Sequence, residues 1–257
     1  MKKETVEKIL SQTKHGYDMI SQKFSQTRKH FWRNLEFIAD FAKDGDSVLD
    51  YGCGNGRLLE LFENKKINYV GVDVSQQLID DAAGHYGAEN RQFKKIDPSQ
   101  TSLAFPDAYF NSIYSIAVFH HFPSEKYRQE VAKELFRATK NGGQVVVTVW
   151  YLWPAFSASW RIRRGKPAFV SLRRGKQKKY YKYVIKNWIE KLKGQSELDW
   201  NDCHISFTDN AGKKFQRFHH AFTKRELRKL FAEAGFEIQK CEVVDGRNIV
   251  LVGKKCY

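Results

Sequence analysis

The chain has 257 residues, enough for one large domain with a sizeable core, and 44 Lys and Arg against 29 Asp and Glu give a net charge of +15. This excess favours a polyanionic partner such as RNA, DNA or an anionic membrane surface. Four scattered cysteines without a C-x-x-C pair argue against a zinc site or a disulfide framework. No run approaches the roughly 18 apolar residues of a membrane span, so we expect a soluble, unprocessed, cytoplasmic protein.

The N-terminal region shows helical spacing of apolar residues between positions 4 and 43. Val6, Ile9 and Leu10 recur at this spacing, and a second set consists of Phe31, Leu35, Ile38 and Ala42. We expect residues 1–45 to form a helical lid over a sheet. Arg28 lies in a polar stretch between the two sets and has no obvious packing role.

A glycine-rich turn follows, in the sequence VLDYGCGNGR at 48–57. A short apolar run ends in an acidic residue, Asp50, and the turn itself contains Gly52, Cys53, Gly54 and Gly56. This order predicts a strand, a tight turn and a helix start, and glycine lets the backbone approach a ligand closely. The dinucleotide fingerprint G-x-G-x-x-G does not fit, because its third glycine would fall on Arg57. The turn is predicted to bind something small.

A second acid lies where a ligand on this turn would need one. The next apolar run ends in Asp73, followed by Val74. The two oxygens of one carboxylate match the hydroxyl pair of a ribose. A glycine-rich turn alone could be only a tight turn, but together with Asp73 it favours a ligand site.

From Asp46 onward, strands and helices are predicted to alternate, as in a parallel sheet covered on both faces. The predicted helices are 56–63, 75–84, 124–139 and 223–235. We expect Asn141-Gly142-Gly143 to stop the third, and Thr223 and Gly235 to cap the fourth. The predicted strands are 47–51, 68–72, 91–96, 111–117, 144–150, 236–244 and 247–253.

The segment 151–215 breaks this alternation and carries most of the charge. Between Arg161 and Lys193 there are 13 Lys or Arg and one acid, Glu190. Cations meet phosphates and aromatic rings stack on unpaired bases, so this segment predicts RNA contact; the alternative is a solvated charged face with ordinary core aromatics. The interleaved aromatic residues are Trp160, Phe169, Tyr180, Tyr181, Tyr183 and Trp188.

Polar residues also follow the strand predicted at 111–117, in the sequence SIAVFHH from Ser115 to His121. In open α/β sheets, ligands bind at the carboxyl ends of the strands. Adjacent histidines do not point to one metal without further ligands, and no third ligand is evident in the sequence, so no metal is expected.

The turn, Asp73 and these later residues resemble the class I S-adenosylmethionine (SAM) dependent methyltransferases. The resemblance implies a Rossmann-like, seven-stranded, mostly parallel sheet of order 3-2-1-4-5-7-6, and SAM as cofactor. It places Asp97 at the adenine amino group, although Asp97-Pro98-Ser99 would also form a turn cap. The implied cofactor-binding residues are Asp50, Gly52, Cys53, Gly54, Gly56, Asp73, Val74, Asp97 and Ser115.

Four stretches resemble a narrower family, the eukaryotic-type tRNA wobble-uridine carboxyl methyltransferases, which convert 5-carboxymethyluridine to its methyl ester. They are FSQTRKHFW at 24–32, SIAVFHH at 115–121, TVWYLW at 148–153 and RFHHAFTKRELRKLFAEAGF at 217–236. The chain departs from the family at Asn111, where Asp is common, and in 151–215, which has no alignable motif. The catalytic residues implied by the resemblance are Arg28, His120, His121 and Arg217.

A carboxylate acceptor is already ionised at pH 7, so methyl transfer to it needs placement and no general base. Arg28 could orient the carboxylate, and one histidine would face the methyl group. An amine or ring nitrogen acceptor would instead need a base, for which histidine is the candidate. Two alternatives remain open: a small-molecule methyltransferase of the quinone or natural-product type, and an RNA-binding module on an inactive methyltransferase fold.

The resemblance also implies a small zinc-binding activator protein at the sheet edge formed by strand 91–96. Arg91, Lys94 and Lys95 make this edge highly charged. The alternative is that these charges only protect an edge strand against aggregation.

Overall fold

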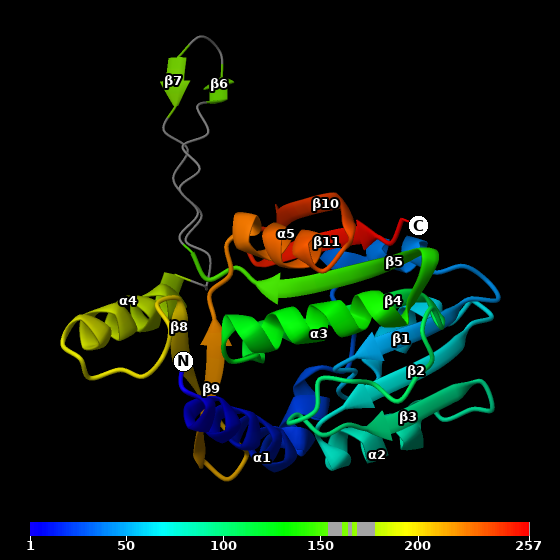
Figure 1. Ribbon diagram of the computed structural model, residues 1–257, viewed down its shortest axis with the longest axis horizontal. Coiled ribbons are helices and arrows are strands. Elements are labelled where there is room, and N and C mark those ends of the chain that lie inside the picture. The colour runs from blue at the N-terminus through cyan, green and yellow to red at the C-terminus, as the bar shows by residue number, and fades with distance from the viewer. Residues whose placement is uncertain (154–160, 164–165, 169–177, 257) are drawn as a thin grey trace.

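The computed structural model describes residues 1–153, 161–163, 166–168 and 178–256, and its centre is a seven-stranded sheet (Figure 1). The strand order is β10-β11-β5-β4-β1-β2-β3. Neighbouring strands from β5 to β3 pair in parallel, whereas β11 is antiparallel to both of its neighbours. The predicted fold class and strand order are therefore confirmed. The strands are β1 Ser47–Tyr51, β2 Asn68–Asp73, β3 Arg91–Lys95, β4 Phe110–Ile116, β5 Thr139–Trp150, β10 Glu237–Val244 and β11 Asn248–Lys254.

Two apolar clusters lie on opposite faces of the sheet. On β1, Leu49 belongs to the cluster that includes Val131 of α3, and Val48 belongs to the cluster that includes Leu35. This alternation follows from the two-residue period of a strand. The α-helices between the strands of the sheet are α2 Gln76–Tyr86, α3 Glu125–Ala138 and α5 Lys224–Glu233. A 3₁₀ helix, η1 Arg33–Phe41, precedes β1, and two others, η2 Arg57–Phe62 and η3 Phe119–His121, follow β1 and β4.

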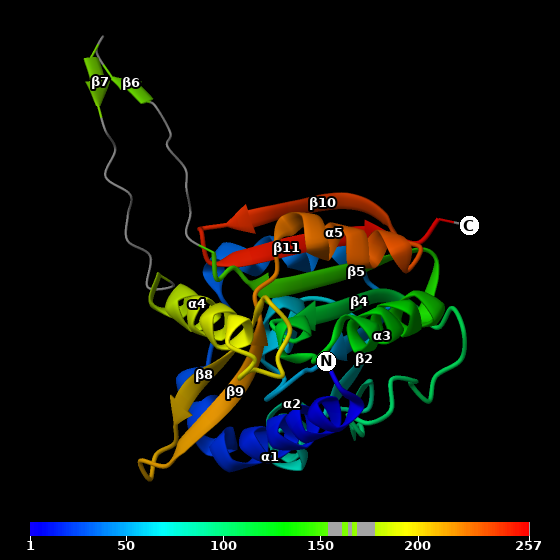
Figure 2. The same ribbon diagram turned by 60° about the vertical axis from the view of Figure 1, so that its left-hand side comes forward.

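The N-terminal helix α1 (Lys3–Thr27) lies across the carboxyl ends of the strands (Figure 2). Side-chain hydrogen bonds attach it to α2, from Ser75 to Asp18 (2.6 Å) and from Ser25 to Asp81 (2.7 Å). Its other side contacts β9, where a Cβ on Gly16 would lie 1.8 Å from the ring of Phe215. The glycine thus allows a close approach of helix and strand, and α1 is held from both sides.

The segment between β5 and α5 contains elements that the sequence did not predict. A helix, α4 (Lys178–Leu192), packs on a hairpin of β8 (Asp202–Thr208) and β9 (Lys214–His220), and β6 (Arg161–Arg163) pairs with β7 (Lys166–Ala168). A separate apolar cluster around Val184, Cys203 and Ile205 joins α4 to the hairpin. Two aromatic residues of the predicted RNA-binding segment, Trp160 and Phe169, lie outside the described residues.

The predicted glycine stop of α3 is wrong. The helix ends at Ala138, where the N–H of Thr139 donates to the carbonyls of Leu135 and Phe136, and the chain continues directly into β5. Gly142 has a φ of +78° in an irregular part of that strand, and its N–H donates to the carbonyl of Lys255 (2.8 Å). Its positive φ therefore serves the strand pairing and not a helix end.

The predicted ends of α5 are confirmed. Thr223 and Glu226 form a reciprocal capping box at its start, and Gly235 follows its end with a φ of +114°.

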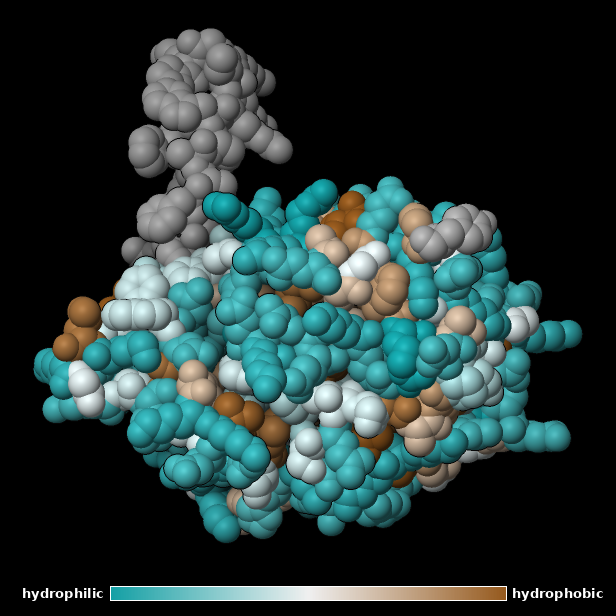
Figure 3. All heavy atoms as spheres, viewed as in Figure 1, coloured by the Kyte–Doolittle hydropathy of each residue, from teal (hydrophilic) through white to brown (hydrophobic). Residues whose placement is uncertain are grey.

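None of the helices in the described part of the chain is long and apolar enough to span a membrane. The face that carries α3 and α5 is mainly hydrophilic (Figure 3). Apolar side chains reach solvent on α4 and just after it, where Ile189, Leu192 and Trp200 are exposed.

Candidate active site

The glycine turn leads from β1 into η2 and is held to the end of β2 by backbone hydrogen bonds. The N–H groups of Gly52 and Cys53 donate to the carbonyl of Val72 (2.7 and 3.0 Å). Gly52, Gly54 and Gly56 have φ values of +82°, +55° and +79°. A Cβ on Gly52 would lie 2.3 Å from a methyl group of Val118. The turn therefore requires glycine both for its conformation and for the space beside it.

Asp73 closes the turn from the end of β2. Its Oδ2 accepts a hydrogen bond from the N–H of Gly54 (2.9 Å), and its Oδ1 accepts one from the N–H of Ser75 (3.0 Å). Burial raises the pKa of Asp73, while these N–H donors favour its ionised form. The two strand ends thus form one unit, with a carboxylate beside the turn.

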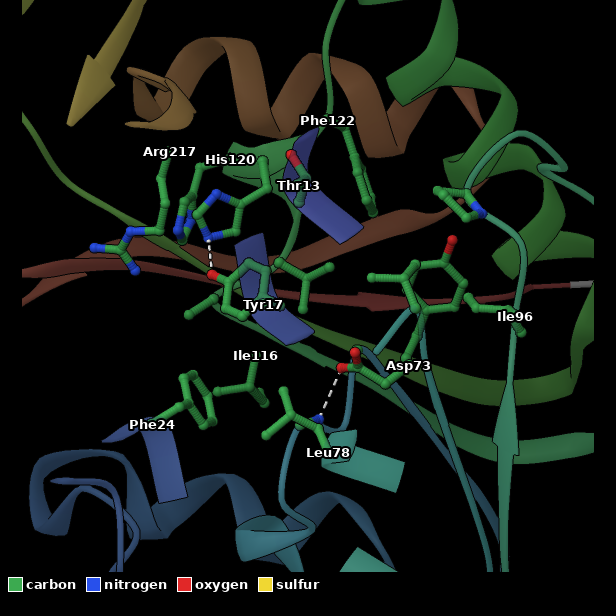
Figure 4. A pocket seen from close by; sticks show the side chains of 18 of the residues that line it. Thr13, Tyr17, Phe24, Asp73, Leu78, Ile96, Ile116, His120, Phe122 and Arg217 are labelled. Atoms are coloured by element: carbon green, nitrogen blue, oxygen red, sulfur yellow. Dashed lines mark hydrogen bonds between the residues drawn. The ribbon is translucent and has the colours of Figure 1, made fainter. Parts of the chain in front are cut away.

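A cavity of about 110 Å³ opens above this turn, and eight of the predicted site residues line it (Figure 4). It is bounded by the carboxyl ends of β1, β2 and β4, by α1, and by Arg217 of β9. The structure thus brings together residues separated by nearly 190 positions in the chain. The eight residues are Arg28, Gly52, Gly54, Asp73, Val74, His120, His121 and Arg217.

The other predicted cofactor residues do not line this cavity. Asp50 lies buried beneath the turn, where the hydroxyl of Tyr69 donates to it (2.7 Å) and burial raises its pKa to about 7. The hydroxyl of Ser115 is buried and has no hydrogen-bond partner in the described structure. Cys53 and Gly56 belong to the turn but are covered by neighbouring residues.

Asp97 is exposed, and its Oδ1 accepts from both the N–H and the hydroxyl of Ser99 (2.9 and 2.8 Å). These hydrogen bonds lower the pKa of Asp97. The geometry is that of the turn cap considered from the sequence. Its neighbours Ile96 and Pro98 line the cavity, and the contact of Asp97 with an adenine stays a prediction.

Two of the predicted residues are buried histidines with different hydrogen-bond partners. Nδ1 of His120 accepts from the N–H of Trp150 (3.3 Å). His121 contacts the carbonyl of Phe218 through Nδ1 (2.9 Å) and the hydroxyl of Tyr17 through Nε2 (2.8 Å). Burial lowers the pKa of His120 well below its usual value and that of His121 to about 3. Both imidazoles are therefore neutral at physiological pH.

A third histidine, His219, which the sequence did not single out as a ligand, joins this pair. One ring nitrogen from each of the three histidines falls within 4.8 Å of the others. His219 is stacked on His120 (5.1 Å between centroids, 14° between planes), and both nitrogens of His121 are already bonded. The guanidinium of Arg217 adds a positive charge beside the cluster. The stacking of His219 on His120, the hydrogen bonds already made by both nitrogens of His121 and the positive charge of Arg217 all oppose the binding of a cation here.

Three arginines face the same cavity. Arg28 ends α1, and its guanidinium lies over the ring of Phe24 (4.4 Å). Arg217 is buried between the rings of Trp150 (5.6 Å) and Phe207 (4.8 Å), and its Nε has no hydrogen-bond partner among the described residues. Burial lowers the pKa of Arg28, and the nearby charge of Arg217 lowers it further. Two positive charges held this close in a buried site repel each other, so the site favours an anionic ligand that offsets them.

Sequence reasoning missed the third arginine and three other residues. Arg57 stacks on the ring of Trp32 (4.0 Å), and burial together with the charge of Arg28 lowers its pKa to about 10. Tyr17 and Trp150 line the cavity, and His219 packs behind it. Trp150 lies within TVWYLW and His219 within RFHHAF, stretches that signalled a site without assigning these residues a role.

Comparison with known proteins identifies the family. Residues 24–240 match the family described as methyltransferase domain. The chain belongs to the methyltransferase domain family. This confirms the predicted class of enzyme and indicates SAM as its cofactor.

Curated relatives of this methyltransferase have tRNA-modifying names. It is 29% identical over 223 residues to a tRNA (carboxymethyluridine(34)-5-O)-methyltransferase of Schizosaccharomyces pombe, covering 86% of this chain and 87% of that protein. It is 36% identical over 137 residues to a protein of the same enzyme name from Xenopus tropicalis, covering 53% of this chain and 20% of that protein. The first three relatives are matched over only 20% to 31% of their own length.

A solved structure shares the fold. A Haloferax volcanii methyltransferase in complex with the Trm112 methyltransferase activator matches with a TM-score of 0.63 and 15% identity, over 95% of this chain and 98% of that one. The fold thus extends over nearly the whole chain.

Proposed function

We propose that this methyltransferase uses SAM to esterify the carboxylate of a 5-carboxymethyl-type wobble uridine in tRNA, in the cytoplasm. The observation that carries the proposal is the composition of the cavity, where Arg28 and Arg217 face two neutral histidines. The two guanidiniums attract an anion, and the two neutral imidazoles neither carry a charge nor protonate that anion at physiological pH. The relatives with tRNA-modifying names support the same substrate.

The residues at the glycine turn fit the cofactor. Gly52 and Gly54 leave room that a side chain would fill, and Asp73 places a carboxylate beside them. When bound, SAM supplies an electrophilic methyl group on a positively charged sulfur. A carboxylate oxygen can take this methyl group, with a C–O bond formed, the C–S bond broken and its electron pair left on sulfur. No proton is released in this reaction.

The arginines and histidines have complementary tasks in this chemistry. A guanidinium holds a carboxylate without protonating it, because its pKa lies far above that of the acid. Imidazoles kept neutral by burial neither protonate the nucleophile nor add to the positive charge. Arg28 and Arg217 would therefore bind and orient the acceptor, and the apolar walls would exclude water.

We propose that tRNA contacts α4, which belongs to the predicted basic segment 161–193, and the residues that follow up to Trp200. Lys182, Lys186 and Lys193 are exposed there, and Trp200 is 51% exposed beside Lys191 (5.8 Å from Nζ to the ring). By contrast, three aromatic residues of α4 pack against the apolar cluster of the hairpin, which leaves them less surface for stacking on bases. These packed residues are Tyr180, Tyr183 and Trp188.

We also propose a small activator protein at the edge of the sheet. β3 is the last strand in the sheet order and pairs only with β2 among the described strands. An added strand could pair with this free edge. The matched Haloferax volcanii enzyme was solved with such an activator. The exposed Lys94 and Lys95 on β3 favour an acidic partner surface.

The test is nucleoside mass spectrometry after incubation of the protein with SAM and tRNA that lacks the methyl ester. We expect the ester of 5-carboxymethyluridine to appear, and we expect much less of it with Arg28→Gln. Binding of the tRNA should weaken steeply with salt, since phosphate contacts release counterions. No methylated nucleoside under conditions in which SAM binds would refute the proposed substrate.

A further inference from the structure

Tyr17 and His121 both line the cavity and form a hydrogen-bonded pair, and Figure 4 shows Tyr17 among the side chains of the cavity wall. Tyr17 comes from α1 and lies outside residues 24–240, the part of the chain that matches the family. The distance from its hydroxyl oxygen to Nε2 of His121 is 2.8 Å. α1 thus places one polar group directly inside the site.

The direction of this hydrogen bond follows from the partners of His121. The carbonyl of Phe218 can only accept, so Nδ1 of His121 (2.9 Å away) carries the proton. Burial, with the charges of Arg217 and Arg28, lowers the pKa of His121 to about 3, so the ring has only this one proton. Nε2 is consequently an acceptor, and the hydroxyl of Tyr17 donates to it.

Because the hydroxyl of Tyr17 donates its proton to His121, the lone pairs of its oxygen can contact a ligand in the cavity. In the described part of the chain this oxygen has no other hydrogen-bond partner, whereas both oxygens of Asp73 already accept backbone N–H groups. The oxygen lies in a wall that also contains Arg28 and Arg217. Unlike the guanidiniums in this wall, a phenol oxygen whose proton points away attracts a positively charged part of a ligand.

We propose that Tyr17, positioned by His121, recognises the positively charged, methyl-bearing sulfur of SAM. The inference rests on the proposed use of SAM and adds a binding residue from α1 to the turn and Asp73. The methyl hydrogens of a sulfonium are polarised and contact oxygen lone pairs favourably. S-adenosylhomocysteine differs from SAM by this methyl group and its charge. Tyr17 should therefore discriminate between the two.

Calorimetry with the full chain tests this inference. Tyr17→Phe should weaken SAM binding about fivefold and change S-adenosylhomocysteine binding less than about twofold, because a weak contact to oxygen is lost only with SAM. Tyr127→Phe is the matched control: Tyr127 also lines the cavity, but its hydroxyl donates to the carbonyl of Pro98 (2.7 Å). This variant should leave the ratio of the two affinities unchanged.

The positioning role of His121 has its own signature. His121→Leu removes the acceptor and should reproduce the loss for SAM alone, whereas the amide oxygen of His121→Gln can accept from Tyr17 and should restore part of it. Melting temperatures identify any variant that fails to fold. Equal losses for both compounds in Tyr17→Phe, or no loss, would overturn the inference while leaving the proposed function intact. A wild-type chain that binds neither compound would overturn the proposed function itself.

Discussion

Replacing Arg217 with glutamine tests whether this residue serves the acceptor or the fold. The residue is only 5% exposed, its Nε has no hydrogen-bond partner among the described residues, and its charge lies close enough to Arg28 to lower the pKa of that residue. In the protein without an acceptor, its burial and this repulsion oppose the favourable contacts with the rings of Trp150 and Phe207. We therefore expect Arg217→Gln to change the melting temperature by no more than about 2 °C.

The effect on catalysis should be much larger. A charge-assisted hydrogen bond to a carboxylate is worth about 1.5–3 kcal/mol, so kcat/KM for the carboxymethyl acceptor should fall about 10- to 150-fold. The assay is methyl transfer from labelled SAM to tRNA containing 5-carboxymethyluridine, with SAM affinity measured separately by calorimetry. SAM affinity should stay within about twofold of wild type, since Arg217 is assigned to the acceptor.

Arg225→Gln is the matched control, because it also removes one positive charge but from an exposed position on α5. It should show only the small, salt-dependent effect of one fewer cation on tRNA binding. A rate for Arg217→Gln within twofold of wild type would refute the acceptor role of Arg217. A large fall in melting temperature would show instead that the residue stabilises the fold.

Three further predictions concern pH and the turn. Methyl transfer should be independent of pH between about 8 and 9, because a carboxylate acceptor titrates near pH 4, the pKa of His121 is lowered to about 3 and that of Asp50 beneath the turn lies at about 7; a rate that still rises between about pH 8 and 9 would indicate a general base. Gly52→Ala should abolish SAM binding and destabilise the fold by at least about 1–3 kcal/mol, measured by urea unfolding, because its φ is +82° and its Cβ would overlap Val118. His220 is hydrogen-bonded to Asp202 and Glu226 (2.6 Å each), and although burial opposes its charged form, these carboxylates raise its pKa. The free energy of unfolding should therefore contain a contribution from His220 that is fully present below its unfolded pKa of 6.5 and is lost as pH rises through the higher folded value. In His220→Gln, urea unfolding should no longer show this decrease in the free energy of unfolding with rising pH.

The centre of the sheet could be predicted from the sequence because its inner strands are buried on both faces and read as apolar runs. The run at Val145 to Val149 shows this directly, since four of its five residues are valine and all are buried. The β8–β9 hairpin was missed because its residues alternate only partly and the Lys and Arg around it obscure the pattern. Its apolar contacts come from α4, a helix that the same charge run concealed.

The site could be predicted only in part, for a related reason. The glycine turn and Asp73 form a local motif, so their spacing in the chain indicates their function. Tyr17, Arg57 and His219 have no such motif; their roles follow from α1 crossing the strand ends and from β9 folding back beside His121. Asp50 shows the opposite: it belongs to the motif, but in the structure it is buried beneath the turn and accepts a hydrogen bond from Tyr69. A place in the motif therefore does not by itself mean contact with the ligand.

The charges of the cavity fit the need to hold a nucleophile without protonating it. A carboxylate that gains a proton loses the lone pair that attacks, so the groups around it must attract an anion and be unable to donate a proton at physiological pH. Guanidiniums meet both conditions. Histidines would not if they were charged, and burial beside Arg217 keeps His120, His121 and His219 neutral. The arginines therefore attract the acceptor, and their charge also helps to keep the neighbouring imidazoles from acting as acids.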